Sequence, residues 1–439
     1  MDSIALVVGT RPEIIKMAPI INEAKVRDLQ IYVIHTGQHY SQEMSKQFFN
    51  SLPLPFPDIN LDIQSENKSV QLGKMISKLG DELIKIQPNI VLAVGDTNSV
   101  VAACLASVQN NIPFGHIEAG LRSYDNTMPE EINRKIVDSV SSLLFAPSQR
   151  ALINLLYEGL DPKRIYLTGN TIVDSIRLYG ENILEQETPK AKEILEEIKE
   201  EFIICTFHRV SNVDNKQNLE EISNALSNYN LMPIIFLMHP RTEKQLKDFN
   251  LYEKLLENEK LHIYGSIDYL SILRLIKDER CKIILTDSGG LQEEASILKK
   301  PCITLRPNTE RPETVESHIN FLVKIDEKEI IQILNQALTN RNFMKKFEEF
   351  GSPYGDGYAS SKILNIIEEN LENMQFESPE LYNKGSKSFF LVKMKETIAR
   401  SVLENNIHCQ VSMVYDEKGK PIPIPDELKK GYRVRAISK

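Results

Sequence analysis

A short stretch near residue 290 combines a strand, small residues and a helix start in a way that suits an anion. Lys282–Thr286 is apolar enough for a buried strand, and Ser288 is a favourable N-cap before the helical pattern that begins at Leu291. Gly289 and Gly290 leave room for a ligand to approach the backbone. The free N–H groups and the dipole of a helix N-terminus favour negative charge. The stretch predicts a phosphate site, although an ordinary capped helix has the same pattern.

Two carboxylates follow on the first turns of this helix. Glu293 and Glu294 lie close enough to the helix start for one of them to face the uncharged part of a phosphorylated ligand. A carboxylate in that place can accept hydrogen bonds from sugar hydroxyls. The combination indicates a ligand with both a phosphate and a polyhydroxylated group.

The turn after the first apolar strand presents two cations. Thr10 and Glu13 have the spacing of a capping box, and Pro12 stands at the first helical position. Arg11 and Lys16 lie near the carboxyl edge of the strand, where parallel sheets bind ligands. A capped surface helix would account for the same residues, but two cations at this edge favour a binding function.

Three carboxylates and one histidine follow strands or open helices along the same predicted edge. Asp96, Glu118 and Glu130 each have an ordinary structural explanation as caps or dipole partners. Together in one cleft, their repulsion would raise the pKa of at least one, giving an acid beside bases. His208 ends the first strand of the second half and would face them across the cleft.

Further motifs limit the chemistry. Arg311 could clamp a phosphate or order its own loop through Glu310. The sequence contains no HExxH and no Cys/His cluster, so we expect no metal. It contains no GxGxxG after the first strand, so we expect no dinucleotide cofactor.

Composition indicates a globular protein with room for two or three domains. The chain has 439 residues, 41% hydrophobic and 26% charged, and a net charge of −9, which does not suggest a broad nucleic-acid surface. No apolar run approaches the length of a membrane span, and the N-terminus has no signal-peptide pattern. The five cysteines form no C-x-x-C pair, so we expect a reducing, cytoplasmic location.

Strands and helices alternate along the chain and predict parallel, doubly wound sheets. The rhythm restarts after Gly169, which indicates two Rossmann-like α/β domains with a cleft between them. Among the helices we expect Ile132–Leu144 and a connecting helix at Asn170–Leu184. The expected units are residues 1–169 with a returning helix at 360–372, residues 170–359, and a small α+β appendage with its linker at 375–439.

The appendage differs in character from the rest. It holds twelve basic and eight acidic residues, whereas the chain before it is strongly acidic. Ser378–Ser388 is typical of a linker, Lys393–Asn405 of a helix, and Ile407–Tyr415 and Tyr432–Ile437 of strands. So short a segment would hardly support a core alone, so we expect it to dock on the catalytic body or on a partner subunit.

These motifs, in this order, resemble the non-hydrolysing UDP-N-acetylglucosamine 2-epimerases, which have the GT-B fold. The similarity covers roughly Ile4 to Leu371. It includes G-T-R-P-E-x-x-K, G-D-T, H-I-E-A-G-L-R, P-E-E-x-N-R, T-G-N-T, the H-R after the second domain's first strand, D-S-G-G-x-Q-E-E, T-E-R-P-E and P-Y-G-D-G.

The resemblance implies reversible conversion of UDP-GlcNAc to UDP-ManNAc, by elimination of UDP to a bound 2-acetamidoglucal and its re-addition, without a cofactor. The acid/base and charge-stabilising positions of the family correspond to Asp96, Glu118, Glu130 and His208. Positions that contact the nucleotide-sugar correspond to Arg11, Lys16 and Arg311. The diphosphate and ribose positions correspond to Ser288, Gly289, Gly290 and Glu294.

The sequence departs from the family in places. Arg209 is followed by Val210-Ser211, where many members carry Arg-Glu. Ile267 and Ile272 stand where well-studied bacterial members place Gln and Phe near uracil, which suggests base recognition through the backbone. Some members bind a second, activating UDP-GlcNAc. The matching positions here are Gln38, His39, Arg209, His239 and Lys74, the last being an Arg in the family.

Other functions remain open from sequence. The same chemistry could act on another UDP-2-acetamido sugar, a GT-B glycosyltransferase would share the nucleotide site, and a UDP-GlcNAc sensor could signal through the appendage. We expect a UDP-sugar as substrate, a product that feeds a surface polysaccharide or glycan, and a homodimer, with neither nucleic-acid binding nor membrane insertion.

Overall fold

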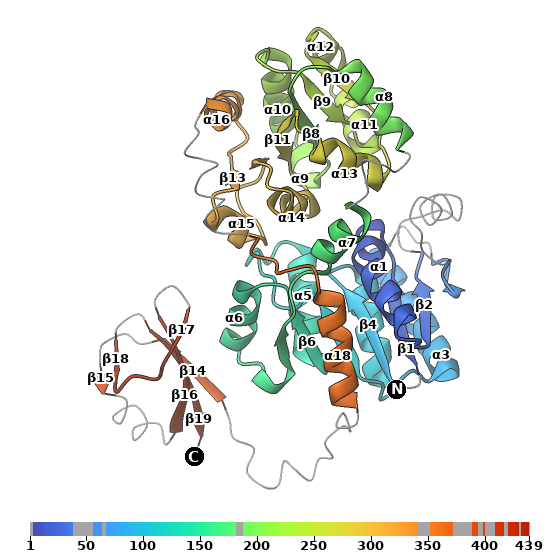
Figure 1. Ribbon diagram of the computed structural model, residues 1–439, viewed down its shortest axis with the longest axis vertical. Coiled ribbons are helices and arrows are strands. Elements are labelled where there is room, and N and C mark those ends of the chain that lie inside the picture. Colours follow the sequence, from blue (N-terminus) through green and yellow to red (C-terminus); the bar gives the residue numbers. More distant parts are fainter. Residues whose placement is uncertain are drawn as a thin grey trace.

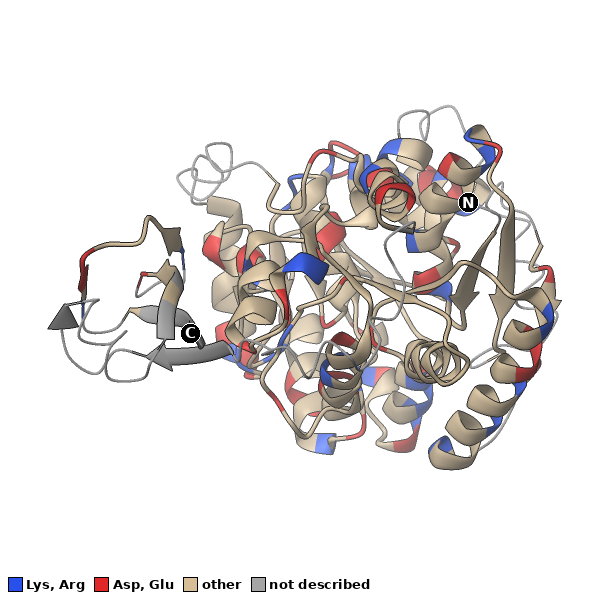
Figure 2. Cartoon of the chain, turned by 90° about the horizontal axis from the view of Figure 1, so that it is seen from below, with Lys and Arg blue, Asp and Glu red and all other residues tan. Residues whose placement is uncertain are grey.

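The computed structural model describes residues 3–37, 56–63, 67–180, 188–339, 352–371, 389–393, 398–399, 409–416, 420–429 and 432–438. Two α/β lobes lie one above the other, with helix α7 between them and a small β unit beside the lower lobe (Figure 1). Lys/Arg and Asp/Glu residues are interspersed along the elements of both lobes (Figure 2). Within the described residues, no helix is long and apolar enough to cross a membrane.

The N-terminal sheet is parallel throughout, in the order β3-β2-β1-β4-β5-β6-β7. Every residue of β1 is buried, as expected for a parallel strand covered on both faces. Because the strand order reverses between β1 and β4, the loops after these strands form the ligand crevice of such a sheet. The strands are β1 (Ile4–Val8), β2 (Ile31–His35), β3 (Ile59–Asn60), β4 (Ile90–Val94), β5 (Phe114–Ile117), β6 (Leu143–Ala146) and β7 (Ile165–Leu167).

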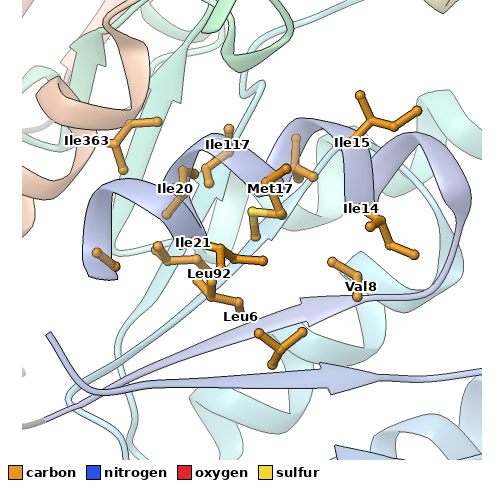
Figure 3. Close-up of a cluster of buried hydrophobic side chains, with 14 of the residues drawn as sticks. Leu6, Val8, Ile14, Ile15, Met17, Ile20, Ile21, Leu92, Ile117 and Ile363 are labelled. Atoms are coloured by element: carbon orange, nitrogen blue, oxygen red, sulfur yellow. The ribbon is translucent and has the colours of Figure 1, made fainter. Parts of the chain in front are cut away.

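Helices cover both faces of this sheet. On one face, Met17 and Ile21 of α1 point toward Leu6 and Leu92 of the sheet, with Ile363 of the last helix nearby (Figure 3). On the other face, α3 and α4 form a second core. The helices of the lobe are α1 (Arg11–Val26), α3 (Lys68–Ile86), α4 (Asn98–Gln109), α5 (Pro129–Val140), α6 (Gln149–Tyr157), the 3-10 turn η1 (Pro162–Arg164), α7 (Thr171–Gly180) and α18 (Ala359–Leu371).

The second sheet repeats this plan in the order β10-β9-β8-β11-β12-β13, again all parallel. Its switch point lies between β8 and β11. The strands are β8 (Phe202–Thr206), β9 (Ile234–Leu237), β10 (Leu261–Tyr264), β11 (Cys281–Thr286), β12 (Cys302–Thr304) and β13 (Asn320–Leu322). The helices are α8 (Pro189–Glu197), α9 (Val210–Val213), α10 (Lys216–Asn228), α11 (Pro240–Asp248), α12 (Tyr252–Leu256), α13 (Tyr269–Lys277), α14 (Gly289–Ile297), α15 (Pro312–Glu316) and α16 (Glu327–Thr339). The predicted pair of Rossmann-like domains is confirmed.

The last helix of the catalytic body returns to the first lobe. Ile363, Leu364 and Ile367 of α18 join the core around α1. Asp174 of α7 accepts the backbone N–H groups of Ala359 and Ser360 at 3.1 and 2.8 Å, which caps α18. The chain therefore ends its second domain by packing across the first.

The appendage is a small antiparallel sheet in the order β14-β19-β16-β17, beside the two-stranded pair β15-β18. Met413 and Tyr415 of β16 pack on the first lobe among Leu152, Leu156 and Leu160, and Tyr415 is 2% exposed. The unit is therefore docked on the catalytic body, next to α6 (Figure 1). Its strands are β14 (Phe389–Lys393), β15 (Ile398–Ala399), β16 (Cys409–Tyr415), β17 (Pro421–Ile422), β18 (Glu427–Leu428) and β19 (Arg433–Ser438).

Two secondary-structure predictions were wrong. The helix expected over Lys393–Asn405 is not present where this span is described, because Lys393 ends β14 and Ile398–Ala399 is β15. The helix expected over Ile132–Leu144 ends at Val140, and Leu143–Ala146 forms β6. Only Ser141 and Ser142 separate the spaced apolar positions of α5 from the apolar strand β6, so the periodicity hid the boundary. The linker at Ser378–Ser388 lies outside the described residues.

Candidate active site

The predicted phosphate cradle lies at the start of α14, at the switch point of the second sheet. Ser288 occupies the N-cap position, but its side chain caps no helix N–H. Its backbone N–H instead donates to Thr286 Oγ1 at 3.0 Å. A Cβ on Gly289 would meet Glu310 Oε1 at 2.6 Å, whereas a Cβ on Gly290 would have only Ser288 Oγ nearby, at 3.9 Å. Gly290 thus leaves open space at the helix N-terminus, which suits an anion.

Asp287, which directly follows β11, organises the neighbouring loop. Its fully buried carboxylate accepts the backbone N–H groups of His208 and Arg209 and the side-chain amide of Asn212 at 2.9–3.1 Å. The end of β11 thereby fixes the chain that leaves β8. The sequence signal was its position, directly before the small-residue turn.

His208 lies in the segment between β8 and α9, and its side chain is 42% exposed. Its ring lies 5.2 Å from the ring of His239, centroid to centroid. Burial lowers the pKa of His239, and His208 and Arg241 lower it further. Arg209 donates from Nε to the backbone oxygen of Asp287 and lies 3.3 Å from Glu310.

Two of the residues expected at a second ligand site, Arg209 and His239, are therefore beside His208. Lys74 lies on the exposed side of α3. Gln38 and His39 lie outside the described residues. The activating second site stays a prediction.

The N-terminal lobe contributes two cations that reach the other lobe. Arg11 approaches the backbone oxygen of Ile267 at 3.4 Å from Nη1. Lys16 is ion-paired with Glu118 of its own lobe, and its Nζ lies 3.0 Å from Glu293 of α14. Both cations therefore lie at the junction of the two sheets, as the sequence analysis expected for one edge.

Glu118 is the most constrained of the predicted catalytic carboxylates. Its backbone has φ 68°, a left-handed conformation that is rare outside glycine and clusters at functional sites. Burial would raise its pKa, but Lys16 and then Arg311 outweigh burial and lower the pKa. The mutual repulsion predicted from the sequence was to raise the pKa of at least one carboxylate of the group; for Glu118 the direction is the opposite, because Lys16 and Arg311 act on it.

His116 and Asp138 hold the loop that carries Glu118 in place through hydrogen bonds. His116 Nδ1 lies 2.6 Å from Asp138 Oδ1, and its Nε2 lies 2.8 Å from the backbone oxygen of Gly95. Asp138 also accepts the N–H of Gly120 at 3.1 Å. His116 was seen only as part of a motif, and the structure shows that it joins the loops after β4 and β5.

The P-E-E-x-N-R motif divides its carboxylates between two roles. Glu131 is buried, accepts the N–H groups of Ser123 and Tyr124, and lies 2.6 Å from Arg134. Glu130 is exposed on the first turn of α5. The exposed carboxylate is therefore the one that a substrate could reach.

Asp96 shares a cation with this motif. Its carboxylate lies 2.8 Å from Arg134 Nη2 and is partly exposed at the end of β4. The guanidinium thus fixes Asp96 beside the start of α5. Together with Glu130, Asp96 brings two of the predicted carboxylates to one edge of the first sheet.

The pair Glu293 and Glu294 is also divided. Glu293 faces Lys16 and Arg311, with Arg311 Nε 2.5 Å from Glu293 Oε1 in an ionic contact. Burial, together with the charge of Glu293, raises the pKa of Glu294 to about 8. Because Glu293 is paired with two cations, Glu294 is the carboxylate of this helix for which the ribose contact stays a prediction.

The two isoleucines near the expected base position point into the core. Ile267 is buried in the hydrophobic cluster below α14, and Ile272 packs against the same cluster. Only the backbone of the Ile267 loop is presented to Arg11. Within the described residues, no group of three His, Cys, Asp or Glu side chains has the arrangement of a metal site.

The two parallel sheets turn their carboxyl edges toward each other, with a helix N-terminus on one side and cations and carboxylates on the other. This arrangement defines a two-domain enzyme of the GT-B type. The chain belongs to the UDP-N-acetylglucosamine 2-epimerase family, whose family model matches residues 22–368.

Two relatives that are 2-epimerases of UDP-sugars match most of this chain. The UDP-N-acetylglucosamine 2-epimerase of Methanocaldococcus jannaschii is 44% identical over 370 residues, which cover 83% of this chain and 98% of that protein. The UDP-2,3-diacetamido-2,3-dideoxy-D-glucuronate 2-epimerase of Pseudomonas aeruginosa is 35% identical over 370 residues, covering 83% and 99%.

Among solved structures, the Methanocaldococcus jannaschii UDP-GlcNAc 2-epimerase in complex with UDP-GlcNAc and UDP has a TM-score of 0.77 at 42% identity, covering 84% of this chain and 99% of that one. The Neisseria meningitidis enzyme bound to UDP-GlcNAc has a TM-score of 0.76 at 33% identity, covering 84% and 100%. The family model ends at residue 368, before the appendage.

Proposed function

We propose that this protein interconverts UDP-GlcNAc and UDP-ManNAc at carbon 2 of the sugar. The observation that carries the proposal is the meeting of Lys16 and Glu118 of the first lobe with Glu293 and Arg311 of the second, beside the open helix N-terminus at Gly290. This arrangement provides cations that could bind a diphosphate. It also provides a carboxylate, Glu118, that stays ionised.

The chemistry balances without an added reagent. A base takes the proton from carbon 2 while the bond between carbon 1 and the UDP oxygen breaks, which leaves a carbon 1–carbon 2 double bond and free UDP. Returning the proton to the opposite face of carbon 2, as UDP re-adds to carbon 1, gives the epimer. Asp96, Glu118, Glu130 and His208 are the candidate acid, base and charge-stabilising groups.

Electrostatics favour this elimination. Positive charge grows on the sugar ring as UDP departs, and an ionised carboxylate such as Glu118 would stabilise it. Negative charge grows on the diphosphate, which Arg11 and the N-terminus of α14 would stabilise. Contacts across the cleft, such as Arg11 to the oxygen of Ile267 and Ser148 to Glu313, would help exclude water from the intermediate.

For the sugar, N-acetylglucosamine is favoured because the relative at 44% identity is a UDP-N-acetylglucosamine 2-epimerase. The diacetamido-glucuronate enzyme at 35% identity supports the alternative, another UDP-2-acetamido sugar. The inward side chains of Ile267 and Ile272 support uracil recognition through backbone groups.

Proton NMR in deuterated water tests the proposal. UDP-GlcNAc incubated with the protein should give UDP-ManNAc with deuterium at carbon 2. A glycosyltransferase or a UDP-GlcNAc sensor would give no 2-epimer, and product that keeps its original hydrogen would exclude proton abstraction.

We further propose a homodimer. Ile132, Ile136 and Val140 lie four residues apart on α5 and are each at least 39% exposed, which forms an apolar stripe on one helix face. Covering this stripe with a second copy would remove it from water. Sedimentation of Ile136→Glu should show a shift toward monomer, and an unchanged dimer would place the interface elsewhere.

The buried, unpaired cysteines at positions 104, 205, 281 and 302 support a cytoplasmic location.

A further inference from the structure

Glu293 is a buried carboxylate with three contacts from three different parts of the fold. Its Oε2 lies 3.0 Å from Lys16 Nζ of α1, and its Oε1 lies 2.5 Å from Arg311 Nε in the loop before α15. Oε1 also accepts from Asn170 Nδ2 at 2.8 Å, at the start of α7 between the lobes. Its side chain has no exposed surface. One carboxylate therefore joins both lobes and the segment that connects them.

The charges around Glu293 are balanced. Two cations, Lys16 and Arg311, face two carboxylates, Glu118 and Glu293, and all four side chains are at most 9% exposed. Arg311 Nη2 also lies 3.9 Å from Glu118, so both cations serve both carboxylates. The other ionisable groups that act on this cluster include Glu294 on α14, Glu310 before α15, Glu313 on α15, Tyr269 on α13, Tyr354 before α18, and Arg134 on α5.

Removing one member leaves an uncompensated charge among buried side chains. Such a charge is costly and moves toward the nearest partner. Without the charge of Glu293, Lys16 and Arg311 would have Glu118 as their main partner. Both cations would then be drawn to one lobe and away from the place where a diphosphate leaves.

We propose that Glu293 is a positioning residue for the reaction: it shares Lys16 and Arg311 with Glu118 across the cleft, so that neither cation is held by Glu118 alone. This inference rests on the proposed function for its kinetic consequence, and on the geometry alone for its effect on Glu118. By facing both cations, Glu293 keeps Glu118 available to the sugar and keeps the cations available to the diphosphate.

The test is Glu293→Gln, which keeps the shape and can still accept from Asn170. We expect kcat for UDP-GlcNAc epimerisation to fall about 10²-fold, the effect of a small misplacement of reacting groups. KM should rise as well, because the displaced cations would contact the diphosphate of the bound substrate and of the transition state alike. The matched control is Asp174→Asn, a buried carboxylate that caps α18 and touches none of the four charges. It should lower stability and leave kcat unchanged.

A second measurement needs no substrate. Carbon-13 NMR of the side-chain carboxyl of Glu118 should show a lower pKa in Glu293→Gln than in the parent, because two cations then act on one carboxylate. An unchanged Glu118 titration would overturn the inference whatever the activity. If the parent protein itself forms no epimer, the proposed function fails, and the NMR titration still decides the role of Glu293.

A double variant covers the case in which Glu293→Gln does not fold. Lys16→Met with Glu293→Gln removes one cation and one anion and restores the balance of charge. If Glu293 acts through Lys16, this double variant should turn over no more slowly than Lys16→Met alone. A further loss of turnover, multiplying that of Lys16→Met, would show that Glu293 acts independently and would overturn the inference.

Discussion

Asp287 accepts the backbone N–H of Arg209 at 2.9 Å, so a carboxylate at the end of β11 fixes the chain that leaves β8. The same carboxylate accepts the N–H of His208 and the amide of Asn212. Because these two strands flank the switch point of the second sheet, this relationship sets where His208 meets the cleft. The strand-end histidine found from the sequence depends on a residue that the sequence did not single out.

The first prediction concerns this carboxylate. Asp287→Ala would remove the acceptor of two partly buried backbone N–H groups and of one N–H of the Asn212 amide, which keeps its bond to the backbone oxygen of Leu305. Each lost bond should cost about 1–3 kcal/mol. We expect urea unfolding to show a loss of several kcal/mol, together with a loss of turnover. Asp214→Asn is the control, because Asp214 pairs with Arg241 at the surface, where such pairs contribute about 1 kcal/mol or less. Equal effects of the two variants would contradict the role given to Asp287.

The second prediction concerns the phosphate cradle. Gly290 lies in a helix without a positive φ, and an added Cβ meets no protein atom closer than 3.9 Å. Gly290→Ala should therefore keep or raise stability, since Ala favours a helix over Gly by about 0.5–1 kcal/mol. If a diphosphate binds here, UDP affinity measured by calorimetry should fall at least about tenfold, or ~1.4 kcal/mol. Unchanged affinity would make α14 an ordinary capped helix.

The third prediction concerns the candidate catalytic carboxylates. Asp96→Asn, Glu118→Gln and Glu130→Gln keep shape and remove charge, and each should lower turnover about 10²–10⁴-fold. UDP affinity should change little, because these groups would serve the sugar ring. Glu131→Gln is a useful comparison, since Glu131 orders the loop at Ser123 and Tyr124. It should chiefly lower stability. Near-normal turnover in the first three variants would remove the proposed active site.

The fourth prediction concerns the pH dependence of stability. Burial raises the pKa of Glu13 to about 7, and burial with the charge of Glu293 raises that of Glu294 to about 8, from 4.5 in each case. The folded protein therefore holds these protons more tightly than the unfolded chain. Their contribution to stability is fully present below about pH 4.5 and is lost as the pH rises to about 8.

Glu294→Gln should accordingly reduce the loss of unfolding free energy between about pH 5 and pH 8. Denaturant unfolding at the two pH values measures it. The same pH slope in Glu294→Gln and in the parent would mean that Glu294 is ionised at both pH values.

The sequence predicted the residues at strand ends well, because parallel strands bring their carboxyl ends to one edge whatever the side chains do. Asp96, Glu118 and His208 were found in this way. Which of two adjacent carboxylates does what could not be predicted. Glu130 and Glu131, or Glu293 and Glu294, differ by about 100° around a helix. Their partners come from distant parts of the chain, as Lys16 does for Glu293.

The two secondary-structure predictions that were wrong have different causes. Only two serines separate the spaced apolar positions of α5 from the apolar strand β6, so the helical period obscured the boundary between them. In the appendage, Ile398–Ala399 pairs with Glu427–Leu428, a contact between distant segments that outweighs local helix propensity. Local patterns carry no information about such pairings.

The last prediction concerns the appendage. Its Tyr415 and Met413 pack in one hydrophobic cluster with Leu152 and Leu156 of α6. Tyr415→Ala in the full chain should loosen the appendage, with a loss of about 1.5–3 kcal/mol for the lost burial, seen as faster proteolysis after residue 371. Ile424→Ala is the control, since Ile424 is 40% exposed on the same unit. Equal proteolysis of the two variants would show that Tyr415 does not hold the unit in place.

Truncation after Met374 tests whether the appendage takes part in the reaction. All of the candidate catalytic and substrate-binding residues precede position 372, so the truncated protein should keep its turnover. It should also be less stable, because the apolar surface of α6 that packs against Tyr415 and Met413 becomes exposed to water. Asn154 of α6 donates to the backbone oxygen of Gly120, two residues after Glu118, so a modest change in turnover would come through this helix. Sedimentation would show whether the oligomeric state changes as well. Loss of all turnover in a folded, truncated protein of unchanged oligomeric state would mean that the appendage supplies a residue to the active site.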